Sequence, residues 1–194
     1  MKQSRGAENS QESSAAYRRG FLNSLGDSAN WPSFSTPSYL EKLNLLADRA
    51  CAKRSIHGYL AALIYHQICE EMAKLLLECA HFHLQCAFFP LRVRRRTNRR
   101  QMFGQLLDEL EQGVMLPGLE AFTHKCREFN GLRISIVHKL ATYSSLTQIR
   151  LEATKAKGLF DEAFEAFDAV YDDYRVIFHG YAKDVESLEE LGEQ

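Results

Sequence analysis

Seven aromatic side chains recur with helical spacing in the last third of the chain, and they constrain the fold more than any other feature. They follow one another at alternating steps of four and three residues: Phe160, Phe164, Phe167, Tyr171, Tyr174, Phe178 and Tyr181. This spacing keeps all seven on one side of an α-helix. Rings of this size bury too much apolar area to be left in water. We expect a core-facing helix, with a seam between two subunits as the first alternative and a base-stacking platform as the second.

The same periodicity predicts four helices before the aromatic one. The first begins at Thr36-Pro37, where a hydroxyl suited to capping precedes a proline suited to the first helical turn. The second follows Ser55 and ends at Phe88-Phe89-Pro90, because proline disfavours helix in the residue before it. The third covers roughly Gln101 to Gln112, and the fourth begins at Pro117.

The fourth predicted helix contains a weak point. We expect Asn130-Gly131 to interrupt or kink it just before Arg133, because glycine weakens a helix interior. A polar stretch from Thr142 to Ser145 then leads into the aromatic helix. The sequence shows no alternation typical of strands, so the predicted fold is an all-α, up-and-down bundle of four to six helices.

The bundle is expected to occupy residues 37–182. Residues 1–36 are polar and rich in Gly, Ser and Asn, which favours a flexible arm. An apolar group in this arm is able to dock as a short helix or hook: Phe21, Leu22, Leu25, Trp31 and Phe34. Residues 183–194 form an acidic tail.

Charge is divided unevenly along the chain. Residues 1–100 contain 15 Lys and Arg against 8 Asp and Glu, whereas residues 101–194 contain 9 against 17. The basic excess is concentrated in the linker 90–100: Arg92, Arg94, Arg95, Arg96, Arg99 and Arg100. A cluster this dense is typical of segments that bind phosphate, and we interpret it as an RNA guide. The alternative is a solvated loop that pairs with the acidic half of the same chain.

Several classes of protein are disfavoured by what the sequence lacks. No apolar run approaches the roughly 20 residues of a membrane helix, and the first residues show no secretory h-region. The five cysteines are scattered, without the close pairs typical of zinc sites: Cys51, Cys69, Cys79, Cys86 and Cys126. We therefore expect a cytoplasmic protein with reduced core thiols, no membrane partner, no metal and no other cofactor.

Arg133 and His138 stand in an otherwise apolar segment and are the best candidates for chemistry. A histidine with a pKa near neutrality can take the proton of a ribose 2′-hydroxyl or give one to the leaving 5′-oxygen. An arginine fork can hold the scissile phosphate and stabilise its growing charge. A step of five residues turns a helix through about 500°, so the two side chains point about 140° apart. They converge only if the helix bends at Asn130-Gly131 or a second subunit closes the gap.

Other polar residues near this pair are assigned supporting roles. Ser135 and Lys139 are close enough in sequence to help position phosphate, and Asn130 stands one turn before Arg133. Glu70 and Glu71 are able to orient or neutralise Arg133, an exposed helix face being the alternative. The isolated histidines are interpreted as surface or core hydrogen-bonding groups: His57, His66, His124 and His179.

Three segments resemble the HEPN (higher eukaryotes and prokaryotes nucleotide-binding) superfamily. Phe129-Asn130-Gly131-Leu132-Arg133 and Val137-His138-Lys139-Leu140 are similar to the Arg-x(4–6)-His motif of that superfamily. The helix from Tyr65 to Leu76, with its acidic pair followed by an apolar-Lys turn, is similar to the second signature. Phe103 to Leu107, then Leu116-Pro117, resembles the segment before the motif. The resemblance covers roughly residues 40–180.

This resemblance implies a bundle that dimerises so that two Arg/His motifs face each other across one cleft. Many members are metal-independent endoribonucleases, often toxins or phage-defence effectors, and others are binding or scaffold domains. RNA, a second copy of the chain and an antitoxin or other operon protein are the implied partners. The position after the motif arginine is usually polar in active members, and here it is Ile134. Two hypotheses follow: an active endoribonuclease, or a catalytically inactive nucleotide-binding or protein-interaction module.

Overall fold

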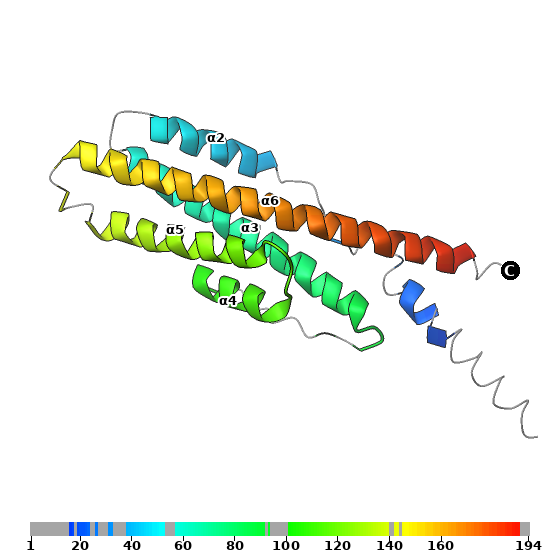
Figure 1. The fold of residues 1–194 in the computed structure, drawn as a ribbon. Coiled ribbons are helices and arrows are strands. Elements are labelled where there is room, and N and C mark those ends of the chain that lie inside the picture. Colours follow the sequence, from blue (N-terminus) through cyan, green and yellow to red (C-terminus); the bar gives the residue numbers. More distant parts are fainter. Residues whose placement is uncertain are drawn as a thin grey trace, which may run out of the picture.

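The computed structural model describes residues 16–17, 19–23, 26, 31–32, 38–52, 57–91, 93, 101–139, 142–143 and 145–190. Five helices account for most of them: α2 (Ser38–Ala52), α3 (His57–Ala87), α4 (Phe103–Gly113), α5 (Leu119–Lys139) and α6 (Leu146–Glu190). They form one bundle (Figure 1), and the described residues contain no strand. The prediction of an all-α bundle of four to six helices is therefore confirmed.

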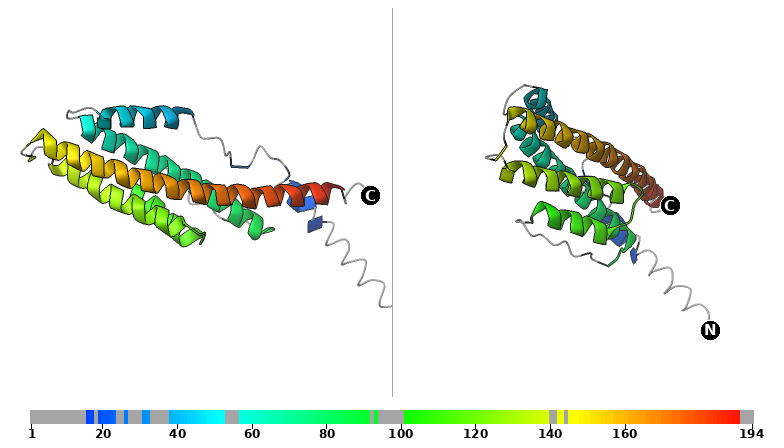
Figure 2. Two further views of the ribbon diagram at one scale, coloured as in Figure 1. Left: turned by 45° about the horizontal axis from the view of Figure 1, so that its top comes forward. Right: turned by 60° about the vertical axis from the view of Figure 1, so that its left-hand side comes forward.

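Helix α3 lies at the centre of the bundle and packs against each of the other four helices. The longest helix, α6, runs beside it, with α2 along one edge and α4 along the opposite edge (Figure 1, Figure 2). Ring contacts between Tyr65 and Phe160 and between Phe82 and Phe178 show that α3 and α6 run in the same direction. Helix α5 packs against both of them and is antiparallel to them.

The aromatic residues of α6 form the middle of the core. Five of the seven are at most 5% exposed: Phe160, Phe167, Tyr171, Tyr174 and Phe178. Phe160 stacks on Tyr65 of α3, with ring centroids 4.3 Å apart. Phe164 is the most open, with 37% of its surface exposed. The helices of the same chain cover this seam, so the core-facing interpretation is confirmed.

The expected break at Asn130-Gly131 is wrong, because α5 continues through both residues. One glycine in a helix interior costs about 1 kcal/mol relative to alanine. Phe129 and Ile136 are fully buried on either side of it, and a buried aromatic or isoleucine side chain is worth about 2–5 kcal/mol. Packing against the core therefore exceeds the weak propensity of Gly131.

Positions near the ends of the bundle differ in detail from the sequence expectations. Trp31, from the predicted arm, packs against Phe82 and Phe178, and residues 183–190 continue α6. The capping positions Thr36-Pro37 and Ser55 lie outside the described residues.

All five cysteines are free and four of them are buried, as expected for core thiols. No helix in the described part of the chain is long and apolar enough to cross a membrane.

Candidate functional site

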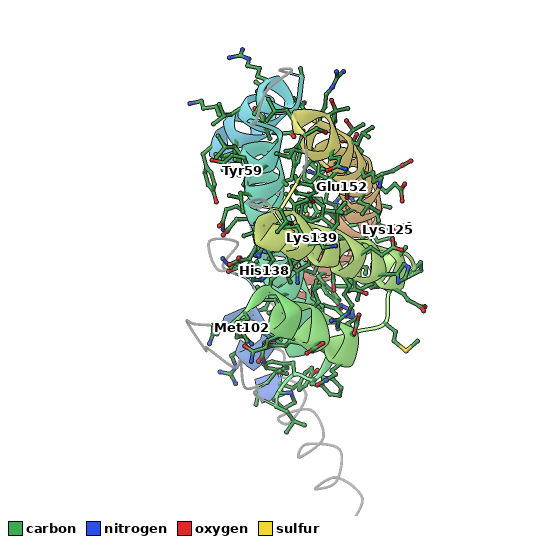
Figure 3. The ribbon with its side chains drawn as sticks, turned by 90° about the vertical axis from the view of Figure 1, so that its left-hand side faces the viewer. Tyr59, Met102, Lys125, His138, Lys139 and Glu152 are labelled. Atoms are coloured by element: carbon green, nitrogen blue, oxygen red, sulfur yellow. The ribbon has the colours of Figure 1, made fainter. Side chains whose placement is uncertain are left out.

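Helix α5 carries both residues of the predicted pair but directs them to different sides. Because the helix is unbroken from Leu119 to Lys139, Arg133 and His138 keep the angular separation of about 140° that five helical steps impose. Arg133 is half-buried, whereas His138 is exposed. In the view along the bundle, His138 and Lys139 lie at the near end of α5 (Figure 3). A single chain therefore does not bring the two candidate residues together.

Arg133 instead contacts a histidine on another helix. Its Nη2 lies 3.1 Å from Nε2 of His66, which is on α3. His66 is 9% exposed, and its ring meets Phe103 of α4 edge to face, with centroids 4.9 Å apart. Side chains from α3, α4 and α5 thus meet at one point.

The protonation state of His66 follows from these surroundings. Burial lowers the pKa of His66, and the positive charge of Arg133 lowers it further. The carboxylate of Glu70 and a hydrogen bond with the Asn130 side chain act in the opposite direction and do not reverse the shift. His66 is therefore neutral at pH 7. Since the Arg133 guanidinium can only donate, Nε2 must be the acceptor and the proton is assigned to Nδ1.

An open pocket of about 600 Å³ lies beside this contact. Arg133, Asn130 and Ile134 line it from α5, and Gln101, Met102 and Asp108 line it from α4 and the residues before that helix. Met102 is 70% exposed and stands at the start of α4 (Figure 3). Guanidinium and amide donors beside an apolar surface can hold a phosphate group together with part of a nucleoside.

Arg133 differs from the nearby Arg127 in how its charge is compensated. Arg127 forms ion pairs with Asp108 at 2.6 Å and with Glu111 at 2.9 Å. Within the described ranges, no carboxylate forms an ion pair with Arg133, and its Nε is buried without a hydrogen-bond partner. Among the described residues, its side chain makes a polar contact with the neutral His66 ring. Among the described residues, Arg133 thus has no carboxylate partner, in contrast to Arg127.

The predicted supporting residues fall in different places. Asn130 lines the pocket, Ser135 is half-buried and Lys139 is exposed. Glu71 binds Lys74 at 2.7 Å on α3 and not Arg133, so its proposed orienting role is not seen. Glu70 also binds Lys74, at 2.9 Å, while lining the pocket. The arginines of the linker lie outside the described residues: Arg92, Arg94, Arg95, Arg96, Arg99 and Arg100.

Sequence reasoning missed His66, which was interpreted as an isolated histidine. A weak signal is present, because His66 stands one helical turn before Glu70 in a segment that resembles a family signature. Spacing along one helix does not show which residue of a second helix lies opposite. The pairing with Arg133, 67 residues away, depends on the register between α3 and α5.

Comparisons with protein-family models, with curated proteins and with solved structures found no match to this chain. Within the described part of the chain, no three His, Cys, Asp or Glu side chains are grouped so that they could hold a metal ion.

Proposed function

We propose that the protein is a metal-independent endoribonuclease of the HEPN type that cleaves RNA in a cleft between two copies of the chain. One observation carries the proposal: Arg133 lies beside an open pocket and forms no ion pair with a carboxylate of the described residues, while His138 is exposed on another side of the same helix. A second copy is required to place a His138 ring beside the phosphate held by Arg133. Ile134 and Val137, which are 40% and 43% exposed, provide apolar surface for such a contact.

The chemistry assigned to these residues is a transesterification. His138 takes the proton of a ribose 2′-hydroxyl, and the resulting oxygen attacks the adjacent phosphorus. The bond from phosphorus to the 5′-oxygen breaks, and that oxygen leaves with a proton from the second His138. Arg133 stabilises the negative charge on the non-bridging oxygens. The products carry a 2′,3′-cyclic phosphate and a 5′-hydroxyl.

The arginine-rich linker and the biological setting complete the proposal. The six arginines of segment 90–100 would guide RNA to the cleft through its phosphates, which gives binding that weakens with salt. A toxin or phage-defence effector, restrained by an antitoxin or another operon protein, is the role that the HEPN resemblance supports.

A second candidate function is a non-catalytic module that binds nucleotides or a partner protein. Two observations favour it. Arg133 is already paired with His66 inside one chain, without any need for His138. Ile134, which lines the pocket next to Arg133, has no group that hydrogen bonds to phosphate or orients a catalytic histidine.

The test is RNA cleavage in EDTA by the wild type, Arg133→Ala and His138→Ala, with mixed tRNA and mRNA as substrates. Fragments with 2′,3′-cyclic phosphate ends, lost in both variants, support the nuclease. His179→Ala is the matched control, because His179 is also an exposed histidine but lies on α6. Absence of cleavage by all proteins, with a dimer seen by light scattering, favours the binding module.

A further inference from the structure

We propose that each chain contains a complete phosphate-binding site formed by Arg133 and His66, in which His66 first positions the guanidinium and then, once protonated, becomes a second donor. The inference rests on the proposed function only in taking RNA as the source of the phosphate. The site itself requires neither the second copy nor His138. Its ligand is a phosphodiester or phosphomonoester group.

Arg133 forms no ion pair with a carboxylate in the part of the chain that the structure describes. Arg127 is an example of an arginine with a structural role, because two carboxylates hold its guanidinium. The acidic residues that line the Arg133 pocket are engaged elsewhere, Glu70 with Lys74 and Asp108 with Arg127. A half-buried guanidinium with a neutral partner remains a strong donor for an anion.

The position of His66 is the second argument. Its Nε2 accepts a hydrogen bond from Arg133 Nη2 at 3.1 Å, so the ring holds the guanidinium on the α3 side of the pocket. Phe103 packs against the edge of the ring and restricts its rotation. A planar donor held in one orientation loses less conformational entropy when an oxyanion binds.

Protonation changes what His66 does in this contact. The protonated ring has no acceptor, so Nε2 and Arg133 Nη2, which lie 3.1 Å apart when the ring is neutral, become two donors that repel each other. A phosphate oxygen that accepts from both groups, once they have moved apart, offsets this repulsion. The groups that face His66 from the packed helices are Glu70 on α3, Phe103 and the pocket residue Asp108 on α4, and Asn130 with Arg133 on α5. Phosphate binding is therefore coupled to proton uptake by His66.

The experiment measures binding of an uncleavable probe, an RNA oligonucleotide methylated at every 2′-oxygen, in EDTA between pH 7.5 and 5.5. We expect the wild type to bind about tenfold more tightly at pH 5.5, the effect of one added charge a few ångströms from a partly solvated phosphate. Arg133→Ala should bind weakly at every pH. His66→Gln keeps an oxygen acceptor for Arg133 but does not titrate, so its affinity should depend less on pH than that of the wild type. In His66→Gln, the gain in affinity between pH 7.5 and 5.5 should be only the part that other titratable groups contribute.

His179→Gln is the control for loss of an exposed histidine, and it should follow the wild-type profile. A second readout uses the wild type alone: the probe should raise the pKa of His66, followed by NMR of its imidazole nitrogens. An unchanged His66 pKa, or a His66→Gln profile that coincides with the wild-type profile, would overturn the proposal. Failure of the nuclease proposal is distinguishable, since it shows as absent cleavage while this binding pattern remains.

Discussion

Arg133 Nη2 and His66 Nε2 lie 3.1 Å apart and join α5 to α3 between residues 67 positions apart in the chain. The contact pairs a permanent cation with a titratable ring at the side of an open pocket. The contact directs Arg133 towards α3. His138, the partner that the sequence motif suggests, lies on another side of α5.

The salt dependence of oligonucleotide binding should distinguish Arg133 from Arg127. If Arg133 contacts phosphate, Arg133→Ala should reduce the slope of log K against log salt by about one unit. Arg127→Ala should leave that slope unchanged, because Asp108 and Glu111 already neutralise its guanidinium. Binding titrations between 50 and 200 mM salt, roughly the range in which counterion release is resolved, provide the measurement. Equal slopes for Arg133→Ala and the wild type would contradict a phosphate contact.

Acid should destabilise the fold through the buried His66 and the half-buried His83. Burial lowers the pKa of both His66 and His83 in the native state. As the pH falls below the ordinary histidine pKa, the unfolded chain binds protons that the native state resists, so the free energy of unfolding decreases. The free energy of unfolding is therefore at its full value above the ordinary histidine pKa, and it falls as the pH drops below that pKa. Urea unfolding at pH 7.5 and 5.5 should show a smaller difference for His66→Gln and for His83→Gln than for the wild type.

The matched control for this pH effect is His124→Gln. His124 is exposed and lies 3.5 Å from Glu128 on the surface of α5. Its replacement should leave the pH difference of the wild type nearly intact, since exposed ion pairs contribute little. If the pH difference in unfolding free energy decreases equally in all three variants, burial is not the cause of the effect.

Much of the fold was predictable because hydrophobic periodicity reports burial directly. The aromatic spacing of α6 gives the correct buried face, from Phe160 to Phe178, since residues at steps of three and four must share one side of a helix. The end of α3 at Ala87 follows from the proline three residues later. The bend at Gly131 was predicted from propensity alone, and propensity was outweighed by the buried neighbours Phe129 and Ile136.

The site was predictable only in part, because it is formed between helices. The sequence predicted a phosphate-binding role for Arg133, and the structure places this residue beside an open pocket, while the role itself stays a prediction. It did not identify His66, since the contact depends on how α3 and α5 are aligned and no local pattern encodes that register. Of the two ways to bring Arg133 and His138 together, the one inside a single chain depended on an irregularity at Asn130-Gly131, where α5 instead continues without interruption.

Replacing two helical glycines with alanine should change the stability of the protein in opposite directions. Gly131→Ala should stabilise the protein by about 0.5–1 kcal/mol, because nothing lies within 4 Å of the added Cβ and alanine restricts the unfolded chain. Gly58→Ala should destabilise it by about 1–3 kcal/mol, since the added Cβ would stand 2.7 Å from Cβ of Ala153. Urea unfolding gives both values. A loss of stability in Gly131→Ala would indicate that α5 requires flexibility at this point.

Ile134→Asn tests whether the residue after the motif arginine limits catalysis. Ile134 is 40% exposed and lines the Arg133 pocket, so an asparagine there has room to hydrogen bond with a bound phosphate. Under the nuclease proposal, cleavage should increase by about tenfold, which corresponds to one added hydrogen bond of about 1.4 kcal/mol in the transition state. Val176→Asn is the control, because Val176 is also an exposed apolar residue, at 73%, but lies on α6. An equal increase in both variants would point to a surface effect, whereas no cleavage by Ile134→Asn would favour the non-catalytic module.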